Sequence, residues 1–242
     1  MLALILHLAG CRSLLYYPTP AHPFDPERAM KLEVEGAQLR IATRRREGGP
    51  AILYFGGNAE DVTLTLEDLA RLFPDHALYL MHYRGYGGST GSPTEAALQA
   101  DALALYDTVR KQHPRISVLG RSLGSGIAIR LASERPVERL ALITPYDSMA
   151  SVAKGHYPYL PTGLLLQDKY ESLKIAPQIK APTTLIVADH DEIIPRRHSD
   201  ALLAAFTPGV ATEHVVPGTD HNDIGGHPLY GRLLRDAAQV GP

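Results

Sequence analysis

A serine flanked by glycines carries the clearest chemical signature in this 242-residue chain. The apolar, β-branched run Ile116–Leu119 leads into Gly120-Arg-Ser-Leu-Gly124, and small and apolar residues continue to Ala132. This order predicts a buried strand, a sharp turn and a helix. Glycines on both sides of Ser122 permit a strained turn that projects the serine from the carboxyl edge of a sheet. The pattern therefore predicts a nucleophile at Ser122.

Other uses of a glycine-rich turn fit this stretch less well. No Gly-Lys-Ser/Thr follows, and the glycine spacing is not that of a dinucleotide-binding fingerprint, so a phosphate site is not expected. The alternative left open is a glycine-rich helix start that carries no chemistry.

A serine hydroxyl becomes a good nucleophile only when a base removes its proton and a carboxylate orients that base. The sequence offers His221, in the glycine-led loop Gly218-Thr-Asp-His-Asn-Asp223 after an expected strand ending at Val216. A plain surface-loop histidine is the alternative for His221. Three other histidines stand at less suitable places relative to the strands: His190, His198 and His227.

The preferred acid is Asp191, in an acidic loop that follows the buried run Thr184–Ala188. The chain order Ser122, Asp191, His221 is the order serine, acid, histidine of one known class of triad. Asp147, after an expected strand ending at residue 143, is the second candidate for the acid.

The remaining aspartate of this loop, Asp189, is interpreted as a turn cap if it is not the acid. A metal-binding site is another interpretation of the cluster Asp189-His190-Asp191 and the pair Asp220-His221. Their spacing matches no established ligand pattern, so neither a metal nor another cofactor is expected.

Acyl transfer also needs donors for the oxyanion that forms in the transition state. The glycine-rich segment Tyr54-Phe-Gly-Gly-Asn-Ala-Glu-Asp61 follows the first strand that leads into a helix. We expect the backbone amides of Asn58 and Leu123 to form an oxyanion hole. A simple strand-to-helix turn capped by Asn58 or Asp61 is a compatible reading.

From residue 50 onward, expected strands and helices alternate, which predicts an α/β fold with a mostly parallel sheet flanked by helices on both faces. Before them, Lys31–Arg45 is expected to form a hairpin of antiparallel edge strands.

The irregular residues 148–175 predict a small lid. Its apolar side chains could accept an acyl chain, although packing in the core is expected for most of them. These side chains are Tyr157, Tyr159, Leu160 and Leu164–Leu166. Further strands are expected at Ala51–Phe55, Ala77–His82, Ile116–Gly120, Leu140–Ile143, Thr183–Ala188 and Glu213–Val216, and helices at Asp61–Phe73, Thr94–His113 and Leu229–Val240.

The motifs together resemble the α/β-hydrolase superfamily over about residues 30 to 240. One is the turn around Ser122, Gly120-Arg-Ser-Leu-Gly-Ser-Gly126, which we call the elbow. The others are Gly57-Asn-Ala-Glu60, Tyr83-Arg-Gly-Tyr-Gly-Gly-Ser-Thr-Gly-Ser-Pro-Thr-Glu95 and Gly218-Thr-Asp-His-Asn222. The nearest branch looks like the serine-aminopeptidase-like proteins, which include protein depalmitoylases and bacterial lipoprotein hydrolases. The resemblance implies a Ser122, Asp191, His221 triad acting on an ester, thioester or amide. Where that family usually has His-Gly-Asn, this chain has Gly56-Gly-Asn58.

The amino terminus resembles a bacterial lipoprotein signal. The apolar run Leu2–Gly10 is too short to span a bilayer and ends in Leu-Ala-Gly before Cys11, the only cysteine. The resemblance implies a signal peptide over 1–10 and a lipid on Cys11. The proline-rich residues that follow predict an extended tether over 11–30, and the hydrolase domain is expected over 31–242. The amino-terminal sequence departs from the usual lipoprotein signal because no lysine or arginine precedes the apolar run. The alternative is an apolar first strand with a buried cysteine, in a cytoplasmic protein.

With 24 basic and 26 acidic side chains, the net charge of −2 gives no reason to expect a nucleic-acid partner. The expected function is hydrolysis of a small or lipid-like acyl ester or thioester, in a protein anchored to a membrane of the bacterial cell envelope. Two alternatives stay open: a non-catalytic binding or scaffolding lipoprotein, and an acyltransferase or peptidase that uses the same triad.

Overall fold

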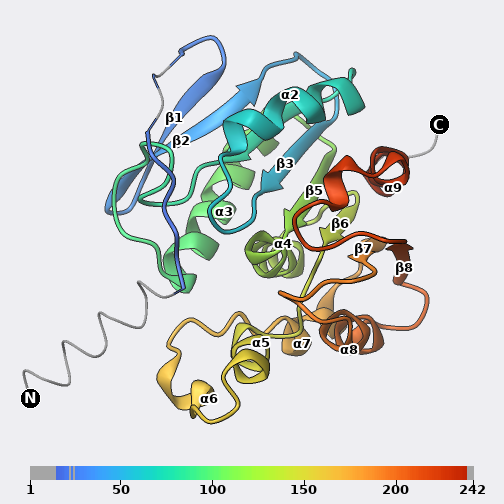
Figure 1. Ribbon diagram of the computed structural model, residues 1–242. Coiled ribbons are helices and arrows are strands. Elements are labelled where there is room, and N and C mark those ends of the chain that lie inside the picture. Colours follow the sequence, from blue (N-terminus) through green and yellow to red (C-terminus); the bar gives the residue numbers. More distant parts are fainter. Residues whose placement is uncertain (1–14, 22, 24, 239–242) are drawn as a thin grey trace, which may run out of the picture.

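An eight-stranded sheet forms the centre of the computed structural model, which describes residues 15–21, 23 and 25–238. The strand order is β1-β2-β4-β3-β5-β6-β7-β8 (Figure 1). Only the pairs β1–β2 and β2–β4 are antiparallel, so the predicted hairpin and the mostly parallel sheet are confirmed. The strands are β1 (Ala29–Val34), β2 (Ala37–Arg44), β3 (Ala51–Phe55), β4 (Ala77–Met81), β5 (Ile116–Arg121), β6 (Leu140–Ile143), β7 (Thr183–Ala188) and β8 (Ala211–Val216).

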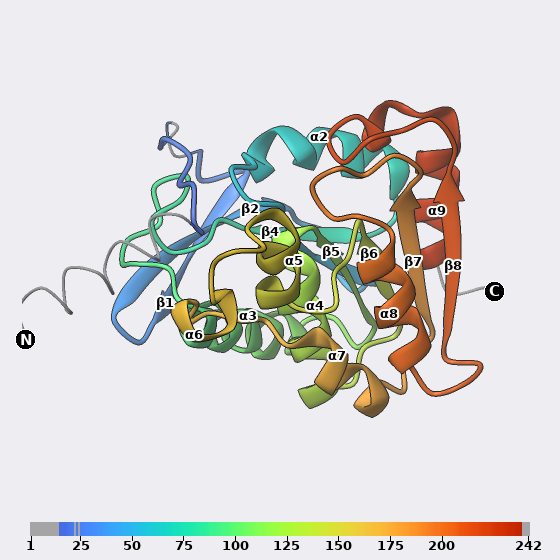
Figure 2. The same ribbon diagram turned by 60° about the horizontal axis from the view of Figure 1, so that its bottom comes forward.

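Helices cover both faces of the sheet because successive strand residues point to opposite sides. In β3, Leu53 and Phe55 join the core beneath α3, α4 and α8, whereas Ile52 and Tyr54 join the core beneath α2 and α9. Figure 2 shows α2 and α3 on opposite sides of the sheet. The helices are α2 (Val62–Leu72), α3 (Glu95–Arg110), α4 (Leu123–Glu134), α8 (Arg197–Ala205) and α9 (Pro228–Ala238).

Side-chain caps explain where two of the predicted helices begin. The Asp61 carboxylate accepts a hydrogen bond from the Thr63 amide at 3.0 Å, and the Thr94 hydroxyl accepts one from the Ala97 amide at 3.1 Å. Each cap satisfies an amide that has no acceptor inside the helix. The sequence analysis did not predict α8, because two of its buried positions carry His198 and Ser199 and give no apolar periodicity.

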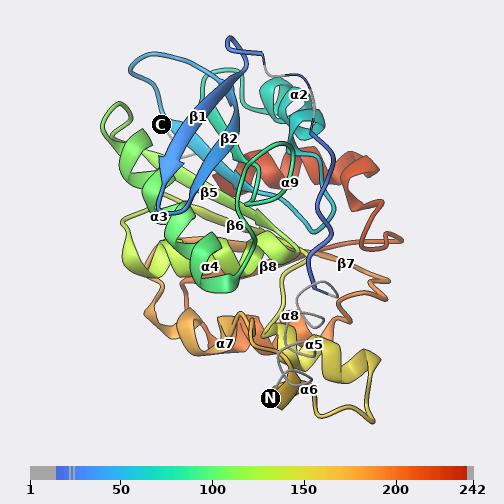
Figure 3. The same cartoon turned by 90° about the vertical axis from the view of Figure 1, so that its left-hand side faces the viewer.

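The residues predicted as a lid form an insertion between β6 and β7. It contains α5 (Met149–His156), α6 (Thr162–Leu165) and α7 (Ser172–Ile175), and Figures 1 and 3 show α6 at its outer end. A covering role for this insertion stays a prediction.

The expectation that most apolar side chains of the insertion pack in the core was wrong. The helix α6 is a single turn that follows Pro158 and Pro161, and one helical turn cannot direct all its side chains toward the core. Five of the side chains are exposed: Tyr157 (60%), Tyr159 (97%), Leu160 (51%), Leu164 (88%) and Leu165 (43%).

Residues 15–19, predicted as part of a tether, lie against the body of the protein. Tyr16 is buried, and its hydroxyl donates to the Asp168 carboxylate at 3.0 Å and lies 2.9 Å from the Tyr170 hydroxyl. The predicted signal peptide and Cys11 lie outside the described residues. Within the described part of the chain, no helix is both long and apolar enough to cross a bilayer.

Close contact between α4 and the sheet depends on two glycines of the elbow. A methyl group on Gly124 would lie 2.0 Å from the Phe55 carbonyl oxygen, and one on Gly120 would lie 2.6 Å from the Ala128 methyl. A backbone carbonyl cannot rotate away as a side chain can. Gly124 is therefore required for the packing of α4 on β3.

Replacing Gly124 with alanine should destabilise the fold because the added methyl has to displace β3 or α4. We expect a loss of at least about 2 kcal/mol, which lowers the melting temperature by roughly 5 °C or more. Thermal unfolding followed by circular dichroism measures this loss. Gly163→Ala in α6 is the control, since nothing lies within 4 Å of its added methyl. Equal melting temperatures for the two variants would contradict the steric account.

Candidate active site

Ser122 stands at a strained turn between β5 and α4. Its backbone has φ 49° and ψ −118°, a conformation that costs a non-glycine residue free energy and that concentrates at functional sites. The Ser122 amide donates to the Ile143 carbonyl of the neighbouring strand at 2.9 Å, which fixes the turn to the sheet edge. The turn thus places the hydroxyl beyond the carboxyl ends of the parallel strands.

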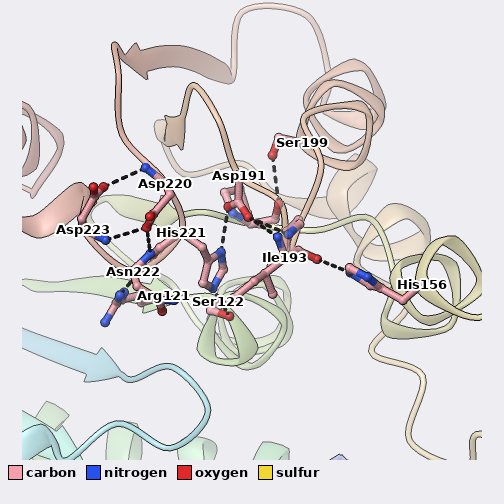
Figure 4. A network of polar contacts seen from close by, with 12 residues as sticks. Arg121, Ser122, His156, Asp191, Ile193, Ser199, Asp220, His221, Asn222 and Asp223 are labelled. Atoms are coloured by element: carbon pink, nitrogen blue, oxygen red, sulfur yellow. Dashed lines mark hydrogen bonds and ion pairs between the residues drawn. The ribbon is translucent and has the colours of Figure 1, made fainter.

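The structure brings the three predicted triad residues together. His221 Nε2 lies 2.9 Å from Ser122 Oγ, and His221 Nδ1 lies 2.7 Å from Asp191 Oδ2 (Figure 4). His221 and Asp191 are buried, with 6% and 8% exposure. Because water is largely excluded, the polarity of each group acts on its neighbour more strongly than it would in solution.

The loop after β7 orients the Asp191 carboxylate. Asp191 Oδ1 accepts hydrogen bonds from the amides of Ile193 at 3.0 Å and Ile194 at 2.7 Å. One oxygen is therefore held by the loop, and the other is left to accept from His221. Two backbone donors and the imidazole of His221 thus hold the Asp191 carboxylate in place.

The loop after β8 is closed by its own side chains. The Asp220 carboxylate accepts from the amides of Asn222 at 2.7 Å and Asp223 at 3.0 Å, and these bonds hold the pKa of Asp220 below its usual value. Asp189 accepts from the Gly218 amide at 3.3 Å. Asp189 therefore caps a turn next to the His221 loop, as the sequence interpretation allowed.

The competing candidates lie elsewhere. Asp147 pairs with His198 Nδ1 at 2.9 Å, and its Oδ1 also accepts from the Ser148 amide, so it does not contact His221. His190 is exposed, and its Nδ1 lies 3.6 Å from Asp189. Among the described residues, no group of three or more histidine, cysteine, aspartate and glutamate side chains is placed to hold a metal ion.

Asn58 and Gly57 lie next to the nucleophile. A methyl on Gly57 would approach Ser122 Cβ to 3.6 Å. The Asn58 side chain is fixed by three partners: its Oδ1 accepts from the Tyr86 hydroxyl at 2.8 Å and the Tyr17 amide at 3.0 Å, and its Nδ2 donates to the Leu15 carbonyl at 2.5 Å. The bonds to residues 15 and 17 were not expected, since the sequence shows no sign that the amino-terminal segment reaches this loop.

The second predicted oxyanion donor is at the first residue of α4. The Leu123 amide is one of the four at a helix start that have no acceptor within the helix, and the helix dipole favours negative charge there. The Tyr146 hydroxyl donates to the Leu123 carbonyl at 3.2 Å, so this peptide is also held from behind.

Solved structures identify the fold. The α/β-hydrolase domain-containing protein 10 from mouse matches with a TM-score of 0.69 at 18% identity, over 86% of this chain and 95% of the mouse chain. A hydrolase from Pseudomonas aeruginosa matches with a TM-score of 0.68 at 17% identity, over 88% and 98% of the two chains. At such low identity the likeness concerns the fold alone.

Sequence relatives are more similar. An uncharacterized protein of Mycobacterium tuberculosis is 39% identical over 197 residues, which cover 78% of this chain and 68% of the relative. The α/β-hydrolase domain-containing protein aho-3 of Caenorhabditis elegans is 32% identical over 190 residues, or 76% and 56% of the two chains. The chain belongs to the α/β-hydrolase superfamily.

A third relative carries an activity in its name. The lysophosphatidylserine lipase ABHD12 of Danio rerio is 29% identical to this hydrolase-fold chain over 170 residues, 60% of this chain and 44% of the fish protein. The chain thus spans about half the length of the worm and fish relatives. A scan against models of protein families found no match.

The tyrosines that support the oxyanion loop were missed by the sequence analysis. Tyr83 donates to the Gly56 carbonyl at 2.6 Å, and Tyr86 bonds to Asn58 as described above. Burial raises the pKa of the Tyr83 hydroxyl well above its usual value, so it stays a donor. The superfamily's usual histidine is absent at Gly56, and Tyr83 holds the loop at that residue. The only feature of the sequence that could have indicated this role of the tyrosines is the motif that begins Tyr83-Arg-Gly-Tyr.

Glu60 and Arg121 join the oxyanion loop to the histidine loop. The Glu60 carboxylate accepts from the Gly57 amide at 2.6 Å and from the Tyr54 hydroxyl at 2.7 Å, and it pairs with Arg121 at 3.3 Å. Arg121 in turn donates to the His221 carbonyl at 3.3 Å. Burial opposes the charge on Arg121, but the nearby Tyr54 and Glu60 outweigh it and raise the Arg121 pKa.

Glu60→Gln should destabilise the protein because it removes the counter-charge of a largely buried arginine. We expect a loss of about 2 kcal/mol, below the 3–5 typical of a fully buried pair since Arg121 is partly exposed. Chemical denaturation measures the loss. The matched control is Glu67→Gln, which removes the exposed pair with Arg28 and should change stability by less than about 0.5 kcal/mol. A similar loss in both variants would show that Glu60 has no special part in joining the loops.

Proposed function

We propose that this protein is a serine hydrolase that cleaves carboxylic esters or thioesters through an acyl-enzyme on Ser122. The observation that carries the proposal is the continuous chain of contacts from Asp191 through His221 to Ser122, at 2.7 and 2.9 Å. These distances are within the range in which a histidine can take the proton of a hydroxyl.

In the proposed reaction, His221 Nε2 takes the proton of Ser122 as Oγ attacks the acyl carbonyl carbon. Asp191 stabilises the imidazolium that forms and holds its Nδ1–H. His221 then gives the proton to the leaving alcohol or thiol. Water, deprotonated by His221, then attacks the acyl-enzyme, the bond between the acyl carbon and Ser122 Oγ breaks, and His221 returns the proton to Oγ as the acid leaves.

The backbone amides of Asn58 and Leu123 would donate hydrogen bonds to the oxyanion of the tetrahedral intermediate and so stabilise its negative charge. The three bonds to the Asn58 side chain and the bond from Tyr83 to Gly56 support this assignment, because a donor that is already in place need not reorganise during the reaction.

A lipid-like acyl ester is the substrate class that we propose. The name of the zebrafish relative supports it, since that protein is called a lysophosphatidylserine lipase. Thioesters, the substrates of the depalmitoylase branch that the motifs resemble, contain the same acyl carbonyl. An acyltransferase or peptidase would use the same triad, and a binding protein would not need the hydroxyl at all.

We also propose that the chain is a lipoprotein anchored through Cys11 in a bacterial cell envelope. The residues Leu8-Ala-Gly before Cys11 support this proposal. Several acyl chains on one cysteine give stable attachment where one chain gives only marginal binding.

Ser122→Ala should abolish ester hydrolysis because the acyl-enzyme can no longer form. Turnover of p-nitrophenyl esters across a range of acyl lengths should fall by at least about 10³-fold. Ser133→Ala, at the far end of α4, is the control and should keep its activity. Equal activity in the wild type and the Ser122 variant, or none in folded wild-type protein, would refute the proposed reaction.

Asp191→Asn should lower turnover about 10⁴-fold, because an amide cannot stabilise the imidazolium and favours the wrong tautomer. Asp147→Asn should change turnover by less than about tenfold, since Asp147 contacts His198 instead. The comparison of kcat for the two variants decides which carboxylate is the acid. A larger loss from the Asp147 variant would reverse the assignment.

Cys11→Ser should prevent lipidation, because serine offers no thiol to acylate. In bacterial cells fed radiolabelled palmitate, wild-type protein should carry the label and fractionate with membranes, and the variant should be neither labelled nor processed. Equal labelling and processing of both forms would exclude the proposed anchor.

A further inference from the structure

The apolar residues at the end of the insertion form a patch that the fold does not cover. We define the apolar tip as Tyr157, Tyr159, Leu160, Leu164 and Leu165, all of which are exposed. Contiguous exposed leucine and tyrosine side chains on a globular protein commonly mark an interaction site. We propose that the apolar tip docks on a lipid bilayer.

The charge around the tip favours a lipid surface. Residues 149–167 contain no aspartate or glutamate, and their basic side chains are Lys154 and His156. Nothing in this segment would therefore be repelled by anionic head groups. Tyrosines suit the boundary between head groups and acyl chains, where the ring is buried and the hydroxyl stays wet, and leucines suit the acyl region just below.

The amino-terminal segment approaches the insertion from which the tip projects. Tyr16 contacts Asp168 and Tyr170, which lie between α6 and α7. Figure 3 shows the first described residues on the side of the molecule where α5 and α6 lie. Cys11 precedes Leu15 by four residues, a span of at most about 14 Å in extended chain. The identity of the partner rests on the proposed anchor at Cys11, which would hold this side of the protein at a membrane.

The inner end of the insertion contacts the loop of the proposed acid. His156, at the end of α5, lies with its Nε2 2.7 Å from the Ile193 carbonyl (Figure 4). The amide of Ile193 donates to Asp191. A bilayer that contacts the tip therefore contacts the same insertion that packs against the loop of Asp191.

A second copy of the chain is the main competing occupant. A stable interface usually buries about 800 Å² on each partner, and the tip consists of five side chains on one short helix and its flanking turns. A patch of five side chains is small for a dimer interface but sufficient for entry into a bilayer.

The absence of tryptophan from the sequence makes a local test possible. Tyr159→Trp places one tryptophan at the tip, and Leu64→Trp places one at a residue of α2 that is 72% exposed. Both are made in full-length Cys11→Ser protein. Because the apolar run 2–10 can itself bind vesicles, the readout has to report on the tip alone. Vesicles of phosphatidylcholine and phosphatidylglycerol, with and without brominated acyl chains, supply that readout.

We expect the emission of the Tyr159→Trp protein to shift to the blue and to be quenched by brominated chains, and that of the Leu64→Trp protein to do neither. Adding Leu164→Ser to the Tyr159→Trp protein should raise the lipid concentration needed for half-maximal quenching about tenfold, the contribution of one buried leucine, and adding Leu64→Ser should leave that concentration unchanged. Unchanged emission at saturating vesicles, or equal quenching at both positions, would overturn the proposal. A blue shift without vesicles that grows with protein concentration would assign the tip to a second copy instead.

Hydrolysis of a soluble short-chain ester by wild-type protein is measured in parallel. Quenching at the tip without ester hydrolysis would support the docking proposal and refute the proposed hydrolase activity. Ester hydrolysis without quenching would support the hydrolase activity and refute the docking proposal.

Discussion

The close approach of α4 to the sheet is the constraint on which the rest of the site depends. Gly120 and Gly124 allow the chain to leave β5 and enter α4 at contact distance, and Ser122 takes up the strain of that turn at φ 49°. A larger residue at Gly124 would collide with the Phe55 carbonyl. The Leu123 amide and the Ser122 hydroxyl both owe their positions at the sheet edge to this packing.

Around that turn, hydrogen bonds from buried and partly buried side chains hold the loops of the site. Glu60 binds the Gly57 amide, and Tyr83 binds the Gly56 carbonyl. Arg121 joins Glu60 to the His221 loop. Buried polar groups that are fully paired are rigid, since breaking any bond leaves an unsatisfied group. These bonds therefore hold the loops that carry Gly57 and His221 in the observed arrangement.

The fold could be predicted, and the three residues of the proposed triad could be assigned to neighbouring loops, because their signals are local. Runs of buried strand residues mark where loops begin, and parallel strands bring those loops to one edge, so Ser122, Asp191 and His221 could be placed without knowing any contact. The bonds from residues 15 and 17 to Asn58 could not be predicted, because they join segments about 40 residues apart with no shared pattern. The exposed tip was misjudged, since apolar composition alone does not say whether a short helix turns inward.

The most direct test of the central claim is labelling by a fluorophosphonate, which reacts only with a serine that an adjacent base has activated. Mass spectrometry of the labelled, digested protein should find a single adduct, on Ser122, and His221→Ala should slow its formation by at least about 10³-fold. Folded wild-type protein that stays unlabelled, or that is labelled at the same rate without His221, would contradict the account.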